Sequence, residues 1–437
     1  MYPAAGWSGY TRGMDVLRSL GLAVVVAAAV ACSGEAPVAN KPPASAAPKT
    51  ATPAPVAPKE ATPEVVPPPE DCIAPVAAEA IASVVRTWEL VGTSREKLFL
   101  GGIGDVVYVG AGLRLYDGEP GKALVDSTRR AAGLAKKPVV AVFGAWPEDA
   151  WLVTLRGIHA DDTGGQEFDL WRWQTDRWVR ETKKALLGDG MAEVYRWTEG
   201  RVLALECSAR PRLAFESFGT AGPLPPRLSR VGNASFCPER FFALPAGDVF
   251  AIDDLSRANH MMIHWCPTCG DPAVEEILPL RLCGAPPTVS MGSIQIPIAP
   301  REAILAVHAQ TPVKPGENAF SGAFLVRREE GAWVGEAVPG GQSVDTIAVG
   351  TDGAIWLATD TLLRRAPKGK WERHGLPPGV TGDIAQVVAV RDDEVWIVAQ
   401  DAVKDGTSWS VYRTGSAQGV ALDLDRGTPL APAKPAG

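Results

Sequence analysis

The feature that most constrains the fold of this chain is an internal repeat of short strand-like segments, with a period of about 40–50 residues. The clearest copy covers residues 344–359 and has a β-branched run, an Asp-Gly turn and a second apolar run around Trp356. The next copy covers residues 384–399 around Trp396, 40 residues further along the chain. Short apolar runs bounded by Asp and Gly turns predict strands rather than long helices.

Earlier copies repeat the same rhythm of strands and turns. The centres of the strongest runs give seven units, at Val107, Trp151, Leu203, Phe250, Ile304, Trp356 and Trp396. This period is typical of β-propeller blades, whose inner strands are buried on both faces. The repeat resembles two-component-regulator-type and other seven-bladed propellers, most closely in the unit that carries Asp352-Gly353 before Trp356. We therefore expect an all-β, seven-bladed β-propeller over residues 73–427, with paired β-sandwiches as the alternative.

A propeller must also join the two ends of its chain, because an open ring would leave an unpaired strand edge. Residues 84–91 and residues 420–424 could each supply the closing strand. We expect residues 84–91 to close the ring, with Trp88 placed as Trp333 and Trp371 are in their own blades. Residues 77–85 have the composition of a short helix, but could equally begin a strand.

Residues 20–33 form an apolar run that ends in small residues and a cysteine, Cys32, with Arg12 and Arg18 in front of it. This is the pattern of an export signal. It resembles the bacterial lipoprotein signal, which implies cleavage after residue 31 and acylation of Cys32. Met14 could be the true start. The alternative, an uncleaved membrane helix, requires a longer apolar run of about 20 residues.

Residues 32–72 consist mainly of Pro, Ala, Lys, Thr, Val and Glu, and they contain no aromatic residue. Proline removes backbone donors, and a segment without aromatic residues cannot build a core. We expect a disordered, extended tether that holds the propeller away from a membrane, or alternatively a proline-rich ligand for another protein. Residues 428–437 are expected to form a disordered tail.

The signal and the tether together predict a lipid-anchored protein of the cell envelope. Ser33 after the acylated cysteine indicates the outer membrane, by resemblance to enteric lipoproteins. The formal net charge is −7 and no basic patch is present, so a nucleic acid is not an expected partner. The expected partners are the membrane, through the lipid, and another envelope protein or a glycan.

Seven cysteines occur, and six remain once Cys32 is acylated. An even number in an exported chain predicts disulfides among Cys72, Cys207, Cys237, Cys266, Cys269 and Cys283. We expect Cys207 to pair with Cys237 and two bonds to form among the other four. A zinc site of Cys266, Cys269, Cys283 and His264, or a redox-active pair in Cys266-Pro267-Thr268-Cys269, are the alternatives.

Other motifs of site chemistry are sparse. Acidic residues around a glycine pair offer a possible calcium loop formed by Asp161, Asp162, Glu167 and Asp169, although their order matches no standard loop. No nucleophile elbow, zinc-protease motif, phosphate-binding loop or dinucleotide fingerprint is present in the sequence. The sequence identifies no catalytic residue, and we expect no cofactor.

The function expected from these features is binding of an envelope component or an extracellular ligand through loops on one face of the ring. A structural subunit of an envelope assembly is one alternative, and it would require a large apolar patch. A propeller hydrolase or lyase is the other alternative. It would require Asp, Glu or His clustered on the funnel loops, and the candidates are dispersed along the sequence.

Overall fold

The computed structural model describes residues 73–430 with gaps, and these residues all belong to one compact unit. The gaps are residues 75, 104–105, 129–133, 135–136, 146–148, 159–165, 182–185, 189–194, 199–200, 208–212, 220–239, 245–248, 254–260, 267–273, 279–282, 284–289, 298–301, 311–320, 342, 381–382, 392–393, 404–405 and 416–418. Between residues 186 and 282, side chains are described only at Leu244 and Phe250. The predicted signal, Cys32 and the predicted tether lie outside the described residues.

The described strands form seven sheets, numbered here in chain order of their first inner strand. From the inside outward, sheet 1 contains β3 (Leu98–Ile103), β4 (Val106–Ala111), β5 (Arg114–Gly118) and β6 (Val125–Asp126). Sheet 2 contains β7 (Val139–Ala145), β8 (Asp149–Ile158), β9 (Gln166–Gln174) and β10 (Arg177–Arg180), and β11 (Leu186–Gly188) also pairs with β9. Sheet 3 contains β12 (Tyr195–Thr198), β13 (Arg201–Cys207) and β14 (Leu213–Gly219), and sheet 4 contains β15 (Arg240–Ala243), β16 (Val249–Asp253), β17 (Met261–Cys266) and β18 (Val274–Leu278).

The remaining sheets take in strands from both ends of the chain. Sheet 5 contains β19 (Ser290–Gln295), β20 (Ile304–Gln310), β21 (Ser321–Glu329) and β22 (Ala332–Ala337). Sheet 6 contains β23 (Thr346–Val349), β24 (Ile355–Ala358), β25 (Leu362–Arg365), β26 (Trp371–His374) and β1 (Ala82–Val84). Sheet 7 contains β27 (Asp383–Ala389), β28 (Val395–Val403), β29 (Gly406–Thr414), β2 (Trp88–Ser94), β30 (Leu422–Asp423) and β31 (Thr428–Pro429). The pairings of β1 with β26 and of β2 with β30 are parallel.

The second strand of each sheet carries one of the seven centres found in the sequence repeat. These strands are β4, β8, β13, β16, β20, β24 and β28. Where side chains are described, these centres are buried, and Trp151, Trp356 and Trp396 have no exposed surface. The second strand has paired strands on both sides and a neighbouring sheet on each face. It therefore has the strongest apolar signal in the sequence.

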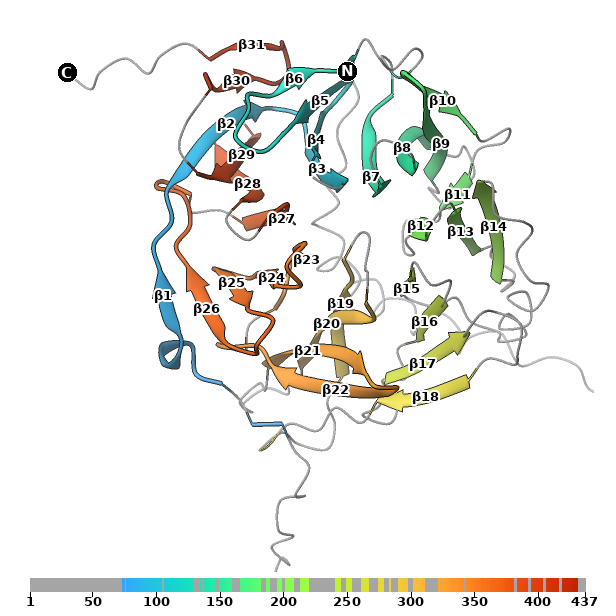
Figure 1. The fold of residues 1–437 in the computed structure, drawn as a ribbon, viewed down its shortest axis with the longest axis vertical. Coiled ribbons are helices and arrows are strands. Elements are labelled where there is room, and N and C mark those ends of the chain that lie inside the picture. Colours follow the sequence, from blue (N-terminus) through green and yellow to red (C-terminus); the bar gives the residue numbers. More distant parts are fainter. Residues whose placement is uncertain are drawn as a thin grey trace, which may run out of the picture. The chain divides into compact units, whose positions relative to one another are not determined.

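Contacts between neighbouring sheets run in a closed circuit (Figure 1). Four hydrophobic clusters each combine side chains from two neighbouring sheets: sheets 7 and 1, sheets 1 and 2, sheets 5 and 6, and sheets 6 and 7. Strands of sheet 2 contact sheet 3, and β12 contacts β15 of sheet 4. Phe250 of sheet 4 packs edge-on against Trp333 of sheet 5, with ring centroids 5.7 Å apart.

This circuit defines the protein as a β-propeller, which confirms the all-β expectation and excludes two paired sandwiches. The count of seven complete blades stays a prediction, because sheet 3 has three described strands. Within the part of the chain that the structure describes, no helix has the length and apolar character of a membrane span.

The ring closes through β2, as the sequence predicted. β2 pairs antiparallel with β29, so an N-terminal strand becomes the fourth strand of the C-terminal sheet. Glu89 on β2 accepts a 2.7 Å hydrogen bond from Arg413 Nε on β29, and both side chains are buried. Trp88 lies in a fourth strand, as Trp333 and Trp371 do. The predicted closure is confirmed, although the closing strand begins at Trp88 rather than at residue 84.

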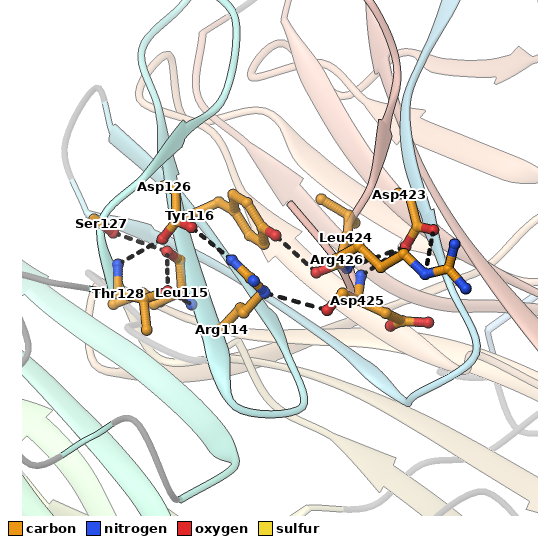
Figure 2. A network of polar contacts seen from close by, with 10 residues as sticks. All are labelled: Arg114, Leu115, Tyr116, Asp126, Ser127, Thr128, Asp423, Leu424, Asp425 and Arg426. Atoms are coloured by element: carbon orange, nitrogen blue, oxygen red, sulfur yellow. Dashed lines mark hydrogen bonds and ion pairs between the residues drawn. The ribbon is translucent and has the colours of Figure 1, made fainter. Parts of the chain in front are cut away.

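The C-terminus also takes part in closure, instead of being only the alternative. β30 pairs with the outer edge of β2, and β31 pairs with β30. Figure 2 shows the polar contacts of this hairpin with sheet 1: Tyr116 donates to the Leu424 carbonyl at 2.7 Å, and Arg114 Nε donates to the Asp425 carbonyl at 3.1 Å. Leu430 N donates to the Ala421 carbonyl, so residues 428–430 belong to the propeller and not to the predicted tail.

The first described segment of the chain crosses the outside of several sheets and ends with β2; it is called here the N-terminal strap (residues 73–94). The Ile73 carbonyl accepts a hydrogen bond from Cys283 N, and the Val76 carbonyl accepts one from Gly340 N. Residues 77–85, where a helix or a strand was expected, contain both: a 3-10 turn (η2, Ala78–Ala80) and β1, which adds a fifth strand to sheet 6 (Figure 1).

Candidate functional site

Three charged residues lie where the innermost strands of consecutive sheets begin. Asp345 immediately precedes β23, Asp383 is the first residue of β27, and Lys97 immediately precedes β3. Because every sheet repeats the same strand order, the starting ends of the innermost strands lie on one face of the ring. The three side chains are exposed. They therefore belong to the inner rim of that face.

A fourth charged residue reaches this rim from the turn between β24 and β25. Thr346 pairs with Ala358 in the sheet, and Asp345 N donates a 2.8 Å hydrogen bond to the Ala358 carbonyl. The turn that follows Ala358 carries Asp360, which is exposed. We call Asp345, Asp360 and Asp383 the acidic rim.

The carboxylates of the acidic rim are close enough to influence one another. Local burial, together with the negative charges of Asp383 and Asp360, raises the pKa of Asp345 to about 6. A like charge nearby disfavours the ionised form of a carboxyl group. Asp345 is therefore exposed to solvent and yet partly desolvated.

The turn that carries Asp360 is held rigid by a buried threonine. The Thr359 hydroxyl accepts a hydrogen bond from Thr361 N at 3.1 Å, and it lies 3.2 Å from both the Thr361 carbonyl and Asp360 Oδ1. Threonine commonly makes such local bonds in turns. This fixed turn positions Asp360 beside the start of β23.

The acidic rim is not neutralised by the residues around it. Among the described residues, no cation lies within ion-pair distance of Asp345 or Asp383, and none pairs with Asp360. The described residues also include no group of three His, Cys, Asp or Glu arranged to hold a metal ion. With respect to the described residues, the arrangement is therefore an uncompensated negative patch that could attract a cationic group.

Lys97 limits this patch toward sheet 1. Its ammonium lies 6.0 Å from the ring centre of Trp409, and desolvation lowers the pKa of Lys97 to about 8. On the opposite face of sheet 7, which packs against sheet 6, burial and the charge of Asp401 both raise the pKa of Tyr412, although a hydrogen bond from Ser410 opposes them. The rim thus changes from negative at sheets 6 and 7 to positive at sheet 1.

Between sheets 6 and 7 lies a buried polar network that supports this part of the ring. Arg364 donates to Asp352 at 2.9 Å and to Glu372 at 3.1 Å. Glu372 in turn lies 3.2 Å from His374 Nε2, and His374 Nδ1 accepts a 2.8 Å hydrogen bond from Arg86. The chain positions of these residues, from 86 to 374, show that the network joins the strap to sheet 6.

Trp356 lies within this network. The guanidinium carbons of Arg86 and Arg364 lie 5.1 and 5.7 Å from the Trp356 ring centre, and the His374 ring lies 4.8 Å away. Burial, together with the charge of Arg86, lowers the pKa of His374 to about 4, although the hydrogen bond and charge of Glu372 act in the opposite direction. Burial alone would raise the pKa of Glu372, but the hydrogen bond and charge of Arg364 outweigh it and lower that pKa. His374 is therefore neutral and Glu372 ionised near pH 7.

The cysteines expected to form disulfides are only partly within the described residues. Cys283 is disulfide-bonded, and its partner lies outside the residues whose side chains are described. This bond removes Cys283 from the alternative zinc site, because a disulfide sulfur is not a thiolate ligand. His264 and Cys266 lie on β17 without described side chains, and Cys72 and Cys269 lie outside the described residues. Cys207 ends β13, again without a described side chain, and Cys237 lies outside.

The alternative calcium loop is divided between a strand and residues outside the described part of the chain. Asp161 and Asp162 lie outside the described residues, whereas Glu167 and Asp169 lie on β9. Asp169 is fully buried and forms an ion pair with Lys137, and Glu167 lies 3.7 Å from Arg156. Both carboxylates in the strand thus have cationic side chains as partners.

No member of the acidic rim was identified from the sequence. The available signal was positional: Asp345 and Asp383 each stand at the start of the inner strand in the two clearest copies of the repeat. That signal gives no reason to include Asp360, which reaches the rim only because β23 and β24 pair in the observed register.

Comparisons with known proteins add nothing on activity. No protein-family model matches the chain, and no curated protein matches it in sequence. The extracellular domain of the hybrid two-component system BT4673 from B. thetaiotaomicron aligns at 11% identity and a TM-score of 0.43, over 76% of this chain and 40% of that one.

Two further structures match over more of their own length. YCF48 bound to D1 peptide aligns at 12% identity and a TM-score of 0.42, over 78% of this chain and 99% of that one. The β-propeller domain of the Trilobed protease from Pyrococcus furiosus, described as having an open velcro topology, aligns at 10% identity and a TM-score of 0.38, over 64% and 86%. At these identities we transfer no ligand or reaction to this chain.

Proposed function

We propose that this protein is a lipid-anchored propeller of the cell envelope that binds a cationic ligand, or the basic surface of an envelope protein, through its acidic rim. The observation that carries the proposal is the uncompensated charge of Asp345, Asp360 and Asp383 on one face of a rigid ring. A concave surface of one sign concentrates ligands of the opposite sign and speeds their association. The disulfide at Cys283 supports an oxidising compartment.

A titration with basic peptides tests the binding role. A fluorescent oligolysine peptide should bind the purified propeller, and affinity should fall steeply as salt rises from 50 to 300 mM, because exposed charges are screened. The triple variant Asp345→Asn/Asp360→Asn/Asp383→Asn should bind about 10-fold more weakly or worse. An oligoglutamate peptide should not bind.

A second triple variant has the same charge change but leaves the acidic rim intact. Glu79→Gln/Glu119→Gln/Glu330→Gln alters three exposed carboxylates, on η2, on the β5–β6 turn and on the β21–β22 turn. It should keep wild-type affinity for the basic peptide. Equal weakening in both triple variants would show that net charge alone binds the peptide, and the proposed site would be wrong.

The lipid anchor is tested separately. Cells that express the protein should incorporate a clickable fatty acid into it, and Cys32→Ala should remove the label. Label retained in that variant would contradict the anchor without affecting the binding role.

The enzyme alternative gains one specific observation from the structure. Asp345 has its pKa raised to about 6 beside two other carboxylates, which come from separate segments of the chain. A raised carboxyl beside an ionised one is the arrangement of a general acid with its partner, as in glycoside hydrolysis. Under this second candidate, Asp345 donates a proton to a leaving oxygen of an envelope glycan.

Release of reducing ends from envelope glycans distinguishes the two functions. A hydrolase should release them with a pH–rate profile that falls above about pH 6, and Asp345→Asn should abolish the release. A binding module should release none at any pH, while still binding the basic peptide.

The assembly-subunit alternative lacks such support. The described exposed large hydrophobics are distributed over separate segments of the chain: Val85, Leu113, Val125, Val334 and Val420.

A further inference from the structure

The start of the N-terminal strap lies against the connection between β18 and β19. The Ile73 carbonyl accepts a 3.1 Å hydrogen bond from Cys283 N, and Ile73 is the first described residue of the chain. From there the strap continues past Gly340 to β1 on sheet 6 and to β2 on sheet 7. One segment of about 20 residues therefore connects the sheet 4–sheet 5 junction with the sheet where the ring closes.

Cys283 is already oxidised at the point where the strap begins. Its partner must bring a Cα atom within about 4.4–6.8 Å, because disulfide geometry allows little more. Consecutive Cα atoms are about 3.8 Å apart, so the residue before Ile73 is held close to Cys283 by the chain itself. That residue is Cys72.

Cys266 and Cys207 are separated from Cys283 by the topology of the sheets. Cys266 ends β17, so it lies at the opposite end of β18 from Cys283, and Cys269 follows it in the same β17–β18 connection. Cys207 ends β13 in sheet 3, and Cys237 stands in the connection from sheet 3 to β15. Sheet 4 lies between β13 and the β18–β19 connection, whereas Cys237 lies outside the described residues.

We propose that Cys72 and Cys283 form a disulfide that locks the free end of the N-terminal strap onto the propeller. The two thiols each lose a proton and an electron. A disulfide of another protein takes up the two electrons and the two protons and is reduced to two thiols. The exchange proceeds through a mixed disulfide with one of the two cysteines, which the other thiolate then displaces. This assignment goes beyond the binding role and does not depend on it.

The position of Cys72 gives the bond a mechanical consequence. Cys72 is the last residue of the predicted tether, so a pull on the tether reaches the propeller first at this residue. With the bond in place, the load passes to the β18–β19 connection. Without it, the load passes to Ile73 and Val76, which hold the strap by single backbone hydrogen bonds and can be peeled away.

Peptide mapping without reduction tests the pairing directly. Digestion of the purified full chain, with free thiols blocked beforehand, should yield a peptide containing Cys72 linked to one containing Cys283, and reduction should separate the two. A Cys283 peptide linked to any other cysteine would overturn the proposal, and so would a blocked, unpaired Cys72.

Hydrogen exchange of the strap tests the consequence. Cys72→Ser and Cys283→Ser should each accelerate backbone exchange at residues 76–86 by 10-fold or more, and the double variant should match the single ones, because all three break the same bond. The variant Cys266→Ser/Cys269→Ser removes two sulfurs elsewhere and should leave the strap unchanged. Unequal effects of Cys72→Ser and Cys283→Ser, or no acceleration in either, would contradict the lock.

Discussion

At the scale of single residues, His374 is a neutral histidine whose two ring nitrogens both have partners. Nδ1 accepts from Arg86, so the ring proton lies on Nε2 and points to Glu372. A proton added at Nδ1 would place two donors against each other in a buried site. For this reason the strap contact depends on the neutral form of His374.

The resulting prediction concerns stability in acid. The folded pKa of about 4 lies below the ordinary value of 6.5, so the stabilisation is fully present above pH 6.5 and is lost as the pH falls toward 4. The loss should reach about 3 kcal/mol. His374→Asn keeps an acceptor near Arg86 without a titrating ring, so its free energy of unfolding should fall less between pH 7 and pH 4. Urea denaturation at several pH values measures both, and parallel curves would show that His374 contributes nothing.

Asp345 should behave in the opposite direction. Its folded pKa of about 6 is raised, so its ionisation destabilises the propeller as the pH rises from about 4 through 6. Asp345→Asn should therefore raise the midpoint of thermal unfolding at pH 7.5 and leave it unchanged at pH 4. A lower midpoint at pH 7.5 would mean that the carboxylate has a stabilising partner.

At the same scale, the buried Glu89–Arg413 pair joins the two ends of the chain. Removal of one partner leaves a buried charge without its counterion, so Glu89→Gln and Arg413→Met should each cost about 3–5 kcal/mol of stability. The double variant should cost less than the sum of the two. The exposed pair Glu119–Lys122 is the matched control, and its loss should cost less than about 1 kcal/mol. Additive effects at Glu89 and Arg413 would argue against direct coupling.

At the scale of elements, the C-terminal hairpin β30–β31 is short but well anchored. Leu424 has no exposed surface, and its carbonyl accepts the Tyr116 hydroxyl, whose pKa burial raises to about 12 (Figure 2). Asp425 accepts from Arg95 N at 2.9 Å and from the Ser94 hydroxyl. A hairpin with two-residue strands is thus held by side chains from sheets 1 and 7.

Deletion of residues 420–437 should destabilise the propeller by about 3–5 kcal/mol, because a buried leucine is lost and the Tyr116 hydroxyl loses its acceptor. Deletion of residues 431–437 alone should leave the urea midpoint unchanged. Equal midpoints for both deletions would mean that β2 closes the ring without help from the C-terminus.

At the scale of the whole molecule, the strap and the closing strand separate the propeller from the segment before it. A chain that starts at residue 72 keeps every described contact and should unfold at the same temperature as the mature chain. A chain that starts at residue 95 loses β1, β2 and the Glu89–Arg413 pair, and its midpoint should fall by 10 °C or more, or it should fail to fold. A lower midpoint for the first chain would mean that residues 32–71 also stabilise the propeller.

The sequence by itself determined the class of fold and the identity of its inner strands. The second strand of each sheet is buried on both faces, so its residues must be apolar, and that local requirement appears in the sequence at Trp151, Trp356 and Trp396. Closure by residues near Trp88 was also predictable, because an exposed edge strand needs a partner.

Only the tertiary structure decided which polar residues meet. Asp345, Asp360 and Asp383 lie in different segments of the chain, and they share one rim because the strand register and the packing of sheets 6 and 7 bring those segments together. Arg86 and His374 are 288 residues apart and meet because the strap adds β1 to β26. Burial of an apolar face is required of each strand locally, whereas contacts between distant polar groups depend on how complete sheets are arranged around the ring.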